Sequence, residues 1–290
     1  MSSKHILSVA PMMERTDRHC RYFLRLLSPN SWLYTEMITA SALVDGRRLH
    51  LLKFHPDEHP VALQLGGSEP EKLARAALSG AVAGYDEINL NVGCPSKRVQ
   101  SGCFGAALMS EPEKVADCVG AMVEAVEIPI TVKTRLGIDD LDSYEFLHRF
   151  VGSISDAGCR TVVIHARKAF LSGLSPKENR QVPPLDYERV HRLKSDYPSL
   201  EIILNGGLDS EEKAVTQLDF VDGVMLGRQA YQNPCLLGAL DSKLFGCSSV
   251  LTREHAFKRF LPYIREELNR GTPLKVMTRH LLGLYAGCPG

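Results

Sequence analysis

Short runs of alternating apolar and polar residues recur along the chain, and longer amphipathic segments separate them. Alternation with a period of two predicts strands, whereas apolar residues three or four apart predict helices. We therefore expect eight strands, at residues 6–12, 31–37, 61–67, 87–93, 128–135, 161–167, 201–207 and 223–228.

Helix-start signals lie between these strands. Segments 69–83 and 111–126 both open with Glu-Pro, which places proline in the first helical turn, and segment 209–219 opens with Asp-Ser and two glutamates. Eight strand–helix alternations over roughly 230 residues predict a (β/α)8 TIM barrel. A doubly wound sheet is the alternative, but no GxGxxG motif follows the first strand.

The pattern changes after Pro234. Segments 253–268 and 274–287 have helical periodicity, and no strand is predicted between them. We therefore expect a barrel domain at residues 1–240 and a small helical domain at residues 241–290.

Composition narrows the class of protein. The 44% hydrophobic and 23% charged residues are typical of a soluble globular chain, and the formal net charge of zero indicates no particular partner. The eight cysteines contain no Cys-x-x-Cys pair, so we expect reduced thiols in a cytoplasmic protein and no metal site. No stretch approaches the ~20 apolar residues of a membrane span.

Two segments are locally basic. Residues 160–194 hold eight Lys and Arg against three Asp and Glu, and residues 253–280 hold seven against three. Such segments are often solvated helix faces, and the alternative is a surface that contacts phosphates.

Polar or glycine residues end nearly every predicted strand. The active sites of TIM barrels lie at these C-terminal strand ends, so we expect the residues to share one rim. Asn89 shares a strand face with Asn91, and is expected either at the site or as a hydrogen-bonding residue inside the barrel. The rim residues are Met12, Met13, Glu36, Gln64, Asn91, Cys94, Lys133, Arg135, His165, Arg167, Asn205, Gly206, Gly207, Gly227 and Arg228.

The glycines after the last two strands are either ordinary turns or a phosphate site, which recurs at this place in TIM barrels. A phosphate there, with the Gln64 amide and the Lys133 amine across the mouth, suits FMN. A Schiff-base aldolase could also use Lys133, but that reaction gives no role to Gln64 or Cys94. Cys94 follows a strand, and its thiol could act as a nucleophile, act as an acid, or simply pack as a small apolar group.

Together these residues resemble the tRNA-dihydrouridine synthases, above all their A-type subfamily. The resemblance runs from about residue 6 to the last residue. The segments that carry it include "APMM", "YTEM", "HPVALQLGGSEP", "YDEINLNVGCPS", "VKTRLGIDD", "HARKAFLSGLSPKENR" and "DGVMLGRQAYQNP".

The resemblance implies an FMN-dependent enzyme that uses NADPH to reduce uridines of the tRNA D-loop to 5,6-dihydrouridine, at positions 20 and 20a. Hydride from flavin N5 would go to C6 of the uracil, and Cys94 would protonate C5. Pro11, Met12, Met13, Gln64, Lys133 and His165 would line the flavin ring, Asn205, Gly206, Gly207, Gly227 and Arg228 would hold its phosphate, and Asn91, Lys177 and Arg180 would contact the tRNA.

In this family the helical domain continues past the segment that corresponds to 280–290, so we expect residues 241–290 to be an incomplete tRNA-binding domain of a monomer. Two other hypotheses remain open from the sequence. One is a flavin barrel that reduces a free pyrimidine or another small enone, in the manner of dihydroorotate dehydrogenases. The other is a non-catalytic RNA-binding barrel.

Overall fold

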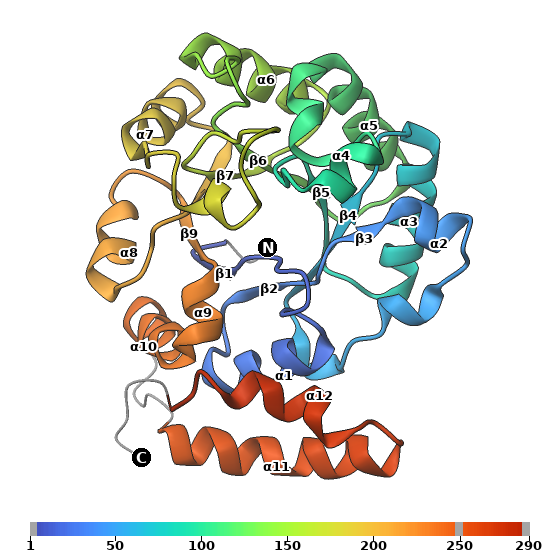
Figure 1. Cartoon of the computed structure of the whole chain (residues 1–290), viewed down its shortest axis with the longest axis vertical. Coiled ribbons are helices and arrows are strands. Elements are labelled where there is room, and N and C mark those ends of the chain that lie inside the picture. Colours follow the sequence, from blue (N-terminus) through green and yellow to red (C-terminus); the bar gives the residue numbers. More distant parts are fainter. Residues whose placement is uncertain (1–4, 247–251, 286–290) are drawn as a thin grey trace.

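Eight parallel strands close into a barrel in the computed structural model, which describes residues 5–246 and 252–285. Each strand pairs with the next along the chain, and the last pairs with the first. Figure 1 shows this ring of strands inside a ring of helices, which confirms the predicted TIM barrel. The strands are β1 (Leu7–Val9), β2 (Trp32–Tyr34), β4 (Val61–Gly66), β5 (Glu87–Asn91), β6 (Ile130–Arg135), β7 (Thr161–His165), β8 (Glu201–Asn205) and β9 (Gly223–Leu226).

The second strand is broken where the sequence predicts one run over 31–37. The backbone leaves the ladder after β2 and rejoins β4 as β3 (Ile38–Thr39). At the break, the Thr35 hydroxyl oxygen accepts a hydrogen bond from the Gln64 N–H at 3.0 Å. A side chain therefore replaces the missing strand carbonyl, a substitution that strand periodicity does not reveal.

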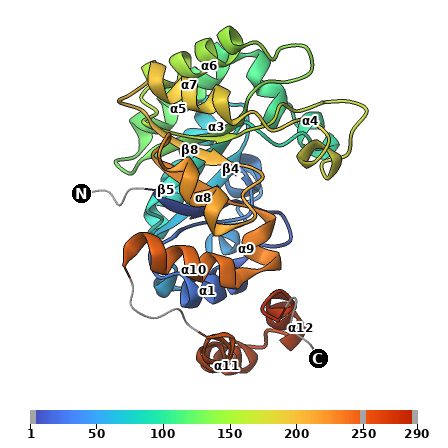
Figure 2. The same cartoon turned by 90° about the vertical axis from the view of Figure 1, so that its left-hand side faces the viewer.

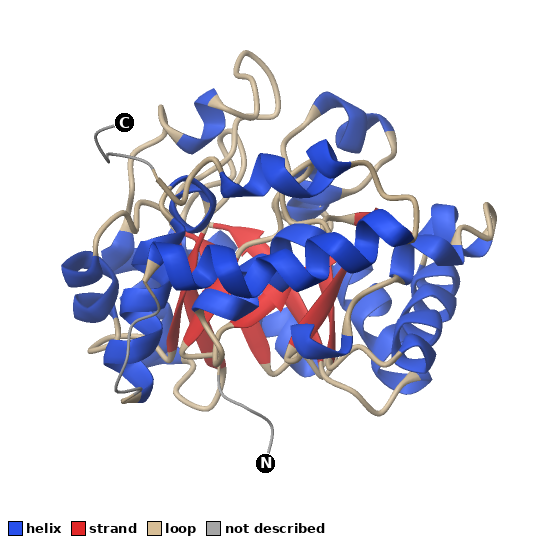
Figure 3. Cartoon of the chain, turned by 90° about the horizontal axis from the view of Figure 1, so that it is seen from below, coloured by secondary structure: helices blue, strands red, loops and turns tan. Residues whose placement is uncertain are grey.

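Helices cover the outside of the barrel, as Figure 3 shows. α3 (Pro70–Ala83) and α5 (Pro112–Ala125) both begin at the proline of Glu-Pro, and the Ser210 hydroxyl caps α8 (Glu211–Gln217), as predicted. The other helices are α1 (Arg18–Leu27), α2 (Ala40–Val44), α4 (Lys97–Ser101), α6 (Tyr144–Asp156), α7 (Tyr187–Asp196), α9 (Arg228–Gln232), α10 (Pro234–Phe245), α11 (Arg253–Asn269) and α12 (Leu274–Thr278), with the 3-10 turns η1 (Leu49–Leu52), η2 (Pro56–Glu58), η3 (Gly105–Ser110), η4 (Glu178–Arg180) and η5 (Arg279–Leu281).

The hydrophobic core has two parts. The larger lies between the strands and the helices, where strand residues such as Leu63, Ile88 and Val132 are fully buried. The smaller fills the inside of the barrel, so the barrel is a packed body rather than a pore. The inner part consists of Ala10, Trp32, Tyr34, Ala62, Val163, Ile203 and Met225.

The C-terminal helices form a separate layer beneath α1 (Figure 2). Phe260 of α11 packs its ring 5.3 Å from that of Phe23, and Tyr263 stacks on Tyr22 at 4.0 Å. The buried Glu267 carboxylate accepts a hydrogen bond from Arg18. Aromatic packing and a buried ion pair therefore dock this layer on the barrel.

Residues 253–285 contain helices and no strand, as predicted, although α10 runs through residue 240 and stays against α1. Across 5–246 and 252–285, no helix is long and apolar enough to cross a membrane. The same residues contain no group of three or more His, Cys, Asp or Glu side chains that could hold a metal ion.

Candidate functional site

Lys133 and Asn205 meet at the C-terminal ends of β6 and β8. The Lys133 ammonium donates to Asn205 Oδ1 at 3.0 Å, and Asn205 Nδ2 donates to the Met225 carbonyl at 2.7 Å. Burial, and then the charge of Arg135, lower the pKa of Lys133 to about 7. Among the described residues, the Lys133 amine has no carboxylate partner, so it is a suitable group for an anion.

His165 lies beside them at the end of β7, in register with Arg135 on one side and Asn205 on the other. Burial, together with the charges of Arg135 and Lys133, holds the pKa of His165 well below its usual range, so the imidazole is neutral. Its Nδ1 atom is buried and has no hydrogen-bond partner within the described chain. An unpaired buried nitrogen at a barrel mouth is a binding feature that a ligand would satisfy.

Gln64 and Asn91 present their amides on the other side of the mouth. Both side chains are buried, and Asn91 Nδ2 donates to Gln64 Oε1 at 2.9 Å. The Asn91 oxygen in turn accepts from the backbone N–H groups of Gly93 at 3.2 Å and Cys94 at 3.0 Å. The two amides therefore connect β4, which carries Gln64, to the loop that carries the Cys94 thiol.

Cys94 is partly exposed, and its thiol lies 3.5 Å from the Ser96 hydroxyl. Its carbonyl accepts from the Ala106 N–H at 3.0 Å, which closes the loop on itself. Gly105 follows in the left-handed region with φ +75°, where an added Cβ would come within 2.6 Å of the Cys94 carbonyl oxygen. Glycine at 105 is thus required for the loop to return this close to the cysteine.

Arg135 links two loops, a role that the sequence analysis does not assign to it. Nε donates to the Gly93 carbonyl at 2.9 Å, and Nη1 donates to the Asn179 carbonyl at 2.9 Å. Gln100 makes a second link, because Nε2 donates to both the Pro95 and Leu171 carbonyls at 2.8 Å. Its spacing from Lys133 predicts that Arg135 shares the rim, but its partners lie too far along the chain to be predicted.

Lys177 and Arg180 lie on the loop after β7, and both are exposed. The Arg180 carbonyl accepts from Arg228 Nη2 at 3.5 Å. Burial of part of its side chain and the charge of Arg228 lower the pKa of Arg180. Figure 2 shows this loop, α4, α9 and α12 on the same side of the barrel. Arg180 and Arg228, which are 48 positions apart, therefore lie together beside the mouth.

Gly206 and Gly207 both have left-handed backbones, with φ +109° and +70°. A Cβ at Gly206 would lie 3.2 Å from His165 Nε2, and one at Gly207 would lie 2.6 Å from the Tyr187 hydroxyl. An added Cβ at Gly227 would meet no atom within 4 Å. The first two glycines are required by their conformation and by close packing, whereas Gly227 borders open space.

The loop after β1 carries Pro11, Met12 and Met13 to the same rim. The Met12 N–H donates to the Thr16 hydroxyl at 3.0 Å, and Met13 is 54% exposed. Glu36, at the break in the second strand, accepts from the Glu14 N–H, and burial raises the pKa of its carboxyl. The strand pattern predicts Glu36 on the rim but gives it no role.

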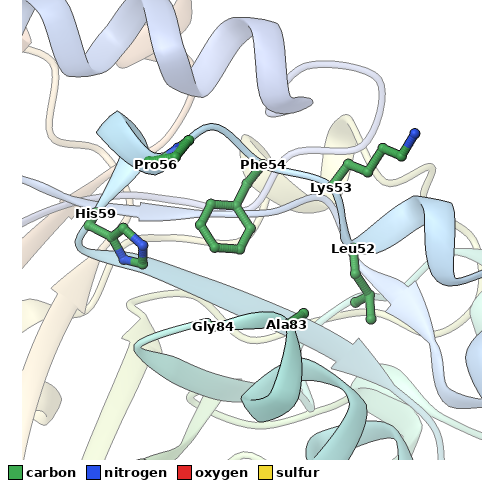
Figure 4. Close-up of a pocket in the computed structure, with 7 residues that line it drawn as sticks. All are labelled: Leu52, Lys53, Phe54, Pro56, His59, Ala83 and Gly84. Atoms are coloured by element: carbon green, nitrogen blue, oxygen red, sulfur yellow. The ribbon is translucent and has the colours of Figure 1, made fainter.

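A hollow of about 380 Å³ lies elsewhere, on the outer flank of the barrel (Figure 4). In Figure 4 the Phe54 ring lies between His59 and Leu52, while Lys53 points away. Pro56, Ala83 and Gly84 complete its lining. It contains none of the predicted site residues, so the site assignment rests on the barrel mouth.

Replacing Lys133 with methionine is expected to stabilise the ligand-free protein by about 1–2 kcal/mol, because the mutation removes a buried amine without an acidic partner. The folded-state pKa of Lys133 is about 7, below its ordinary 10.5, so the unfolded chain binds more protons between these values. The penalty is complete below about pH 7 and fades as the pH rises toward 10.5. Urea unfolding should therefore show a larger gain at about pH 6 than at about pH 9; lower stability at both pH values would contradict this account.

Comparison with known proteins supports one family throughout. The family model for dihydrouridine synthases matches residues 8–290. A relative from Shewanella oneidensis is 57% identical over 98% of this chain and 84% of its own length, and one from Vibrio cholerae is 57% identical over 98% and 87%. A third, from Escherichia coli strain K12, is 58% identical over 98% and 82%. All three are named tRNA-dihydrouridine(20/20a) synthase. The chain belongs to the dihydrouridine synthase family.

Proposed function

We propose that this protein reduces uridines of tRNA to dihydrouridine at positions 20 and 20a, the positions in the names of its relatives. One observation carries the assignment to the barrel mouth. The Asn91 amide binds both the loop of Cys94 and the side chain of Gln64, and this contact supports a site that combines a thiol with a ring-binding amide. A proton donor and a cofactor surface would then act on one uracil.

The mouth suits FMN. Lys133 offers an amine without an acidic partner, and His165 offers an unpaired nitrogen. Gly227 borders open space, where a phosphate can approach the backbone. When bound and reduced by NADPH, FMN would supply the hydride that is added to uracil C6.

The residues of this chain would position the reactants and move the proton. Gln64 and Lys133 would hold the polar edge of the ring, where the Lys133 amine would favour negative charge. Pro11, Met12 and Met13 would cover an apolar face of the ring, and Gly227 and Arg228 would hold the phosphate together with the backbone at Asn205, whose side chain is bonded to Lys133 and Met225. Asn91 contacts the target base, while the Cys94 thiol protonates C5 and leaves a thiolate.

The tRNA would approach over the basic loop. Lys177 and Arg180 are exposed there, and Arg228 lies against the same loop. We assign residues 1–240 to catalysis and the helices of 241–290 to tRNA binding, with α10 tying the two parts together. A monomeric cytoplasmic enzyme accords with this substrate.

Replacing Lys177 and Arg180 together with alanine is expected to weaken tRNA binding by about tenfold and to lower its salt slope by about 1–2, because two phosphate contacts are lost. Filter binding across a salt series measures both quantities. The matched control replaces Lys114 and Lys213, two lysines on α5 and α8. Equal slopes for the two double variants would place the tRNA elsewhere.

The visible absorption spectrum of the purified protein tests the proposed function directly. We expect FMN that bleaches with NADPH and regains its colour when unmodified tRNA is added. Recovery with free uridine and not with tRNA would favour reduction of a small molecule. Failure to bind FMN after reconstitution would refute the flavin assignment.

A further inference from the structure

A continuous chain of hydrogen bonds crosses the inside of the barrel from its mouth to the opposite end, where the strands begin. Asn91 donates to Gln64, Gln64 Nε2 donates to Asn89 Oδ1 at 2.8 Å, and Asn89 Nδ2 donates to the Thr131 hydroxyl at 2.8 Å. Thr131 then donates to Glu87 at 2.6 Å. Gln64, Asn89 and Thr131 are in register on β4, β5 and β6, so the sheet itself aligns them. Asn89 thus lies inside the barrel, one of its two predicted locations.

Glu87 fixes which group donates and which accepts in each hydrogen bond of this network. The Thr131 hydroxyl has one hydrogen, and it donates that hydrogen to the Glu87 carboxylate. The Thr131 oxygen can then only accept, which turns the amino group of Asn89 toward it. The Asn89 oxygen in turn faces Gln64, whose amino group must donate to it.

The Cys94 end requires the same direction. The backbone N–H groups of Gly93 and Cys94 only donate, so Asn91 must face them with its oxygen. Its amino group then points to the oxygen of Gln64. Donor-only groups at one end and an acceptor-only group at the other leave one arrangement in which every bond is made.

The Glu87 carboxylate accepts from donors on several sides. His5 Nε2 lies 2.7 Å from Glu87, and Nδ1 lies 3.1 Å from Glu201, so both ring nitrogens face carboxylates and both carry protons. Tyr34 also donates to Glu87 at 2.9 Å, and Trp32 stacks on the His5 ring at 4.2 Å. His5, Trp32, Glu87 and Glu201 lie at or just before the N-terminal ends of their strands, at the end of the barrel opposite the mouth, and Tyr34 ends β2.

We propose that Thr131 and Asn89, anchored on Glu87, are positioning residues that orient the amides of Gln64 and Asn91 and thereby hold the Cys94 loop. The inference deepens the proposed function, because it concerns the same site. Neither residue touches the reactants. The remaining N–H of Gln64 and its second oxygen lone pair are then presented to the ring in one orientation, since an inverted amide would break the chain.

Thr131→Val tests the proposal, because it removes the hydroxyl and keeps the shape, while Thr131→Ser keeps the hydroxyl. The first readout is the rate at which iodoacetamide alkylates Cys94 in the flavin-free protein, followed by mass spectrometry of its peptide. The second is the FMN dissociation constant from fluorescence quenching. We expect Thr131→Val to change the alkylation rate and weaken FMN binding by about fivefold each, the effect of one hydrogen bond, and Thr131→Ser to match the wild type.

Thr161→Val is the matched control. The Thr161 hydroxyl donates at 2.8 Å to Glu201, the other carboxylate beside His5, but it takes no part in the hydrogen bonds from Asn91 to Glu87. Both readouts should therefore stay at the wild-type values. Thr131→Ala removes the hydroxyl in a second way, should the valine variant fold poorly. Equal effects of Thr131→Val and Thr131→Ser, or no effect of Thr131→Val and Thr131→Ala, would overturn the proposal. Because alkylation needs neither tRNA nor flavin, its outcome is separate from that of the proposed function.

Discussion

Cys94→Ala is expected to lower the rate of tRNA reduction by about 10²–10⁴-fold while the protein keeps its flavin, because a positioned acid contributes about this much. The partly exposed thiol lies on a loop tied to Asn91, and alanine removes the proton without disturbing the backbone bonds that hold the loop. Single-turnover oxidation of the NADPH-reduced enzyme by unmodified tRNA measures the rate.

Cys103→Ala is the matched control for this variant. Cys103 lies nine positions along the same segment and is exposed, and no role is assigned to it. Its loss should leave the rate near that of the wild type. Cys94→Ser separates acidity from size, because a hydroxyl is a poorer acid than a thiol at the same place. Full dihydrouridine formation by Cys94→Ala would remove the acid role.

Glu87→Ala is expected to lower the free energy of unfolding of the flavin-free protein by about 3–5 kcal/mol, the usual effect of removing one partner of a buried ion pair. The substitution leaves the His5 imidazolium with only Glu201 and leaves two hydroxyls, of Tyr34 and Thr131, without their acceptor. Urea unfolding measures the loss. Glu113→Ala, which breaks an exposed ion pair with Arg149, should cost less than about 1 kcal/mol.

The pH dependence of the wild type provides an independent check. The two carboxylates raise the pKa of His5 to about 9 in spite of its burial. The group therefore stabilises the fold fully below its ordinary pKa of 6.5, and this contribution is lost as the pH rises through 9. Stability should fall less over that interval in Glu87→Ala, whose His5 has lost its nearest carboxylate. An equal decline in the free energy of unfolding of the wild type and of Glu87→Ala would show that Glu87 does not raise the pKa of His5.

The sequence predicts the strand order and the rim because both depend on local periodicity. Lys133 and His165 each end an apolar run, so a barrel places them at one mouth. The pairing of His5 with Glu87 could not be predicted, because the partners are 82 positions apart and each stands next to the start of a strand, where polar residues usually face water. The hydrogen bonds of Arg135 could not be predicted either. Its acceptors are backbone carbonyls of distant loops, and every residue type provides such a carbonyl.

The tie between the loop of Cys94 and the loop of Lys177 constrains how substrate choice can be altered in this scaffold. The Arg135 guanidinium donates to the carbonyls of both Gly93 and Asn179, so the two loops are held together as one structural unit. Transplanting only the loop after β7 from a relative with other target positions would also shift the loop of Cys94. Exchange of both loops together with the residue at 135 is therefore the smallest graft that keeps the loop of Cys94 in place.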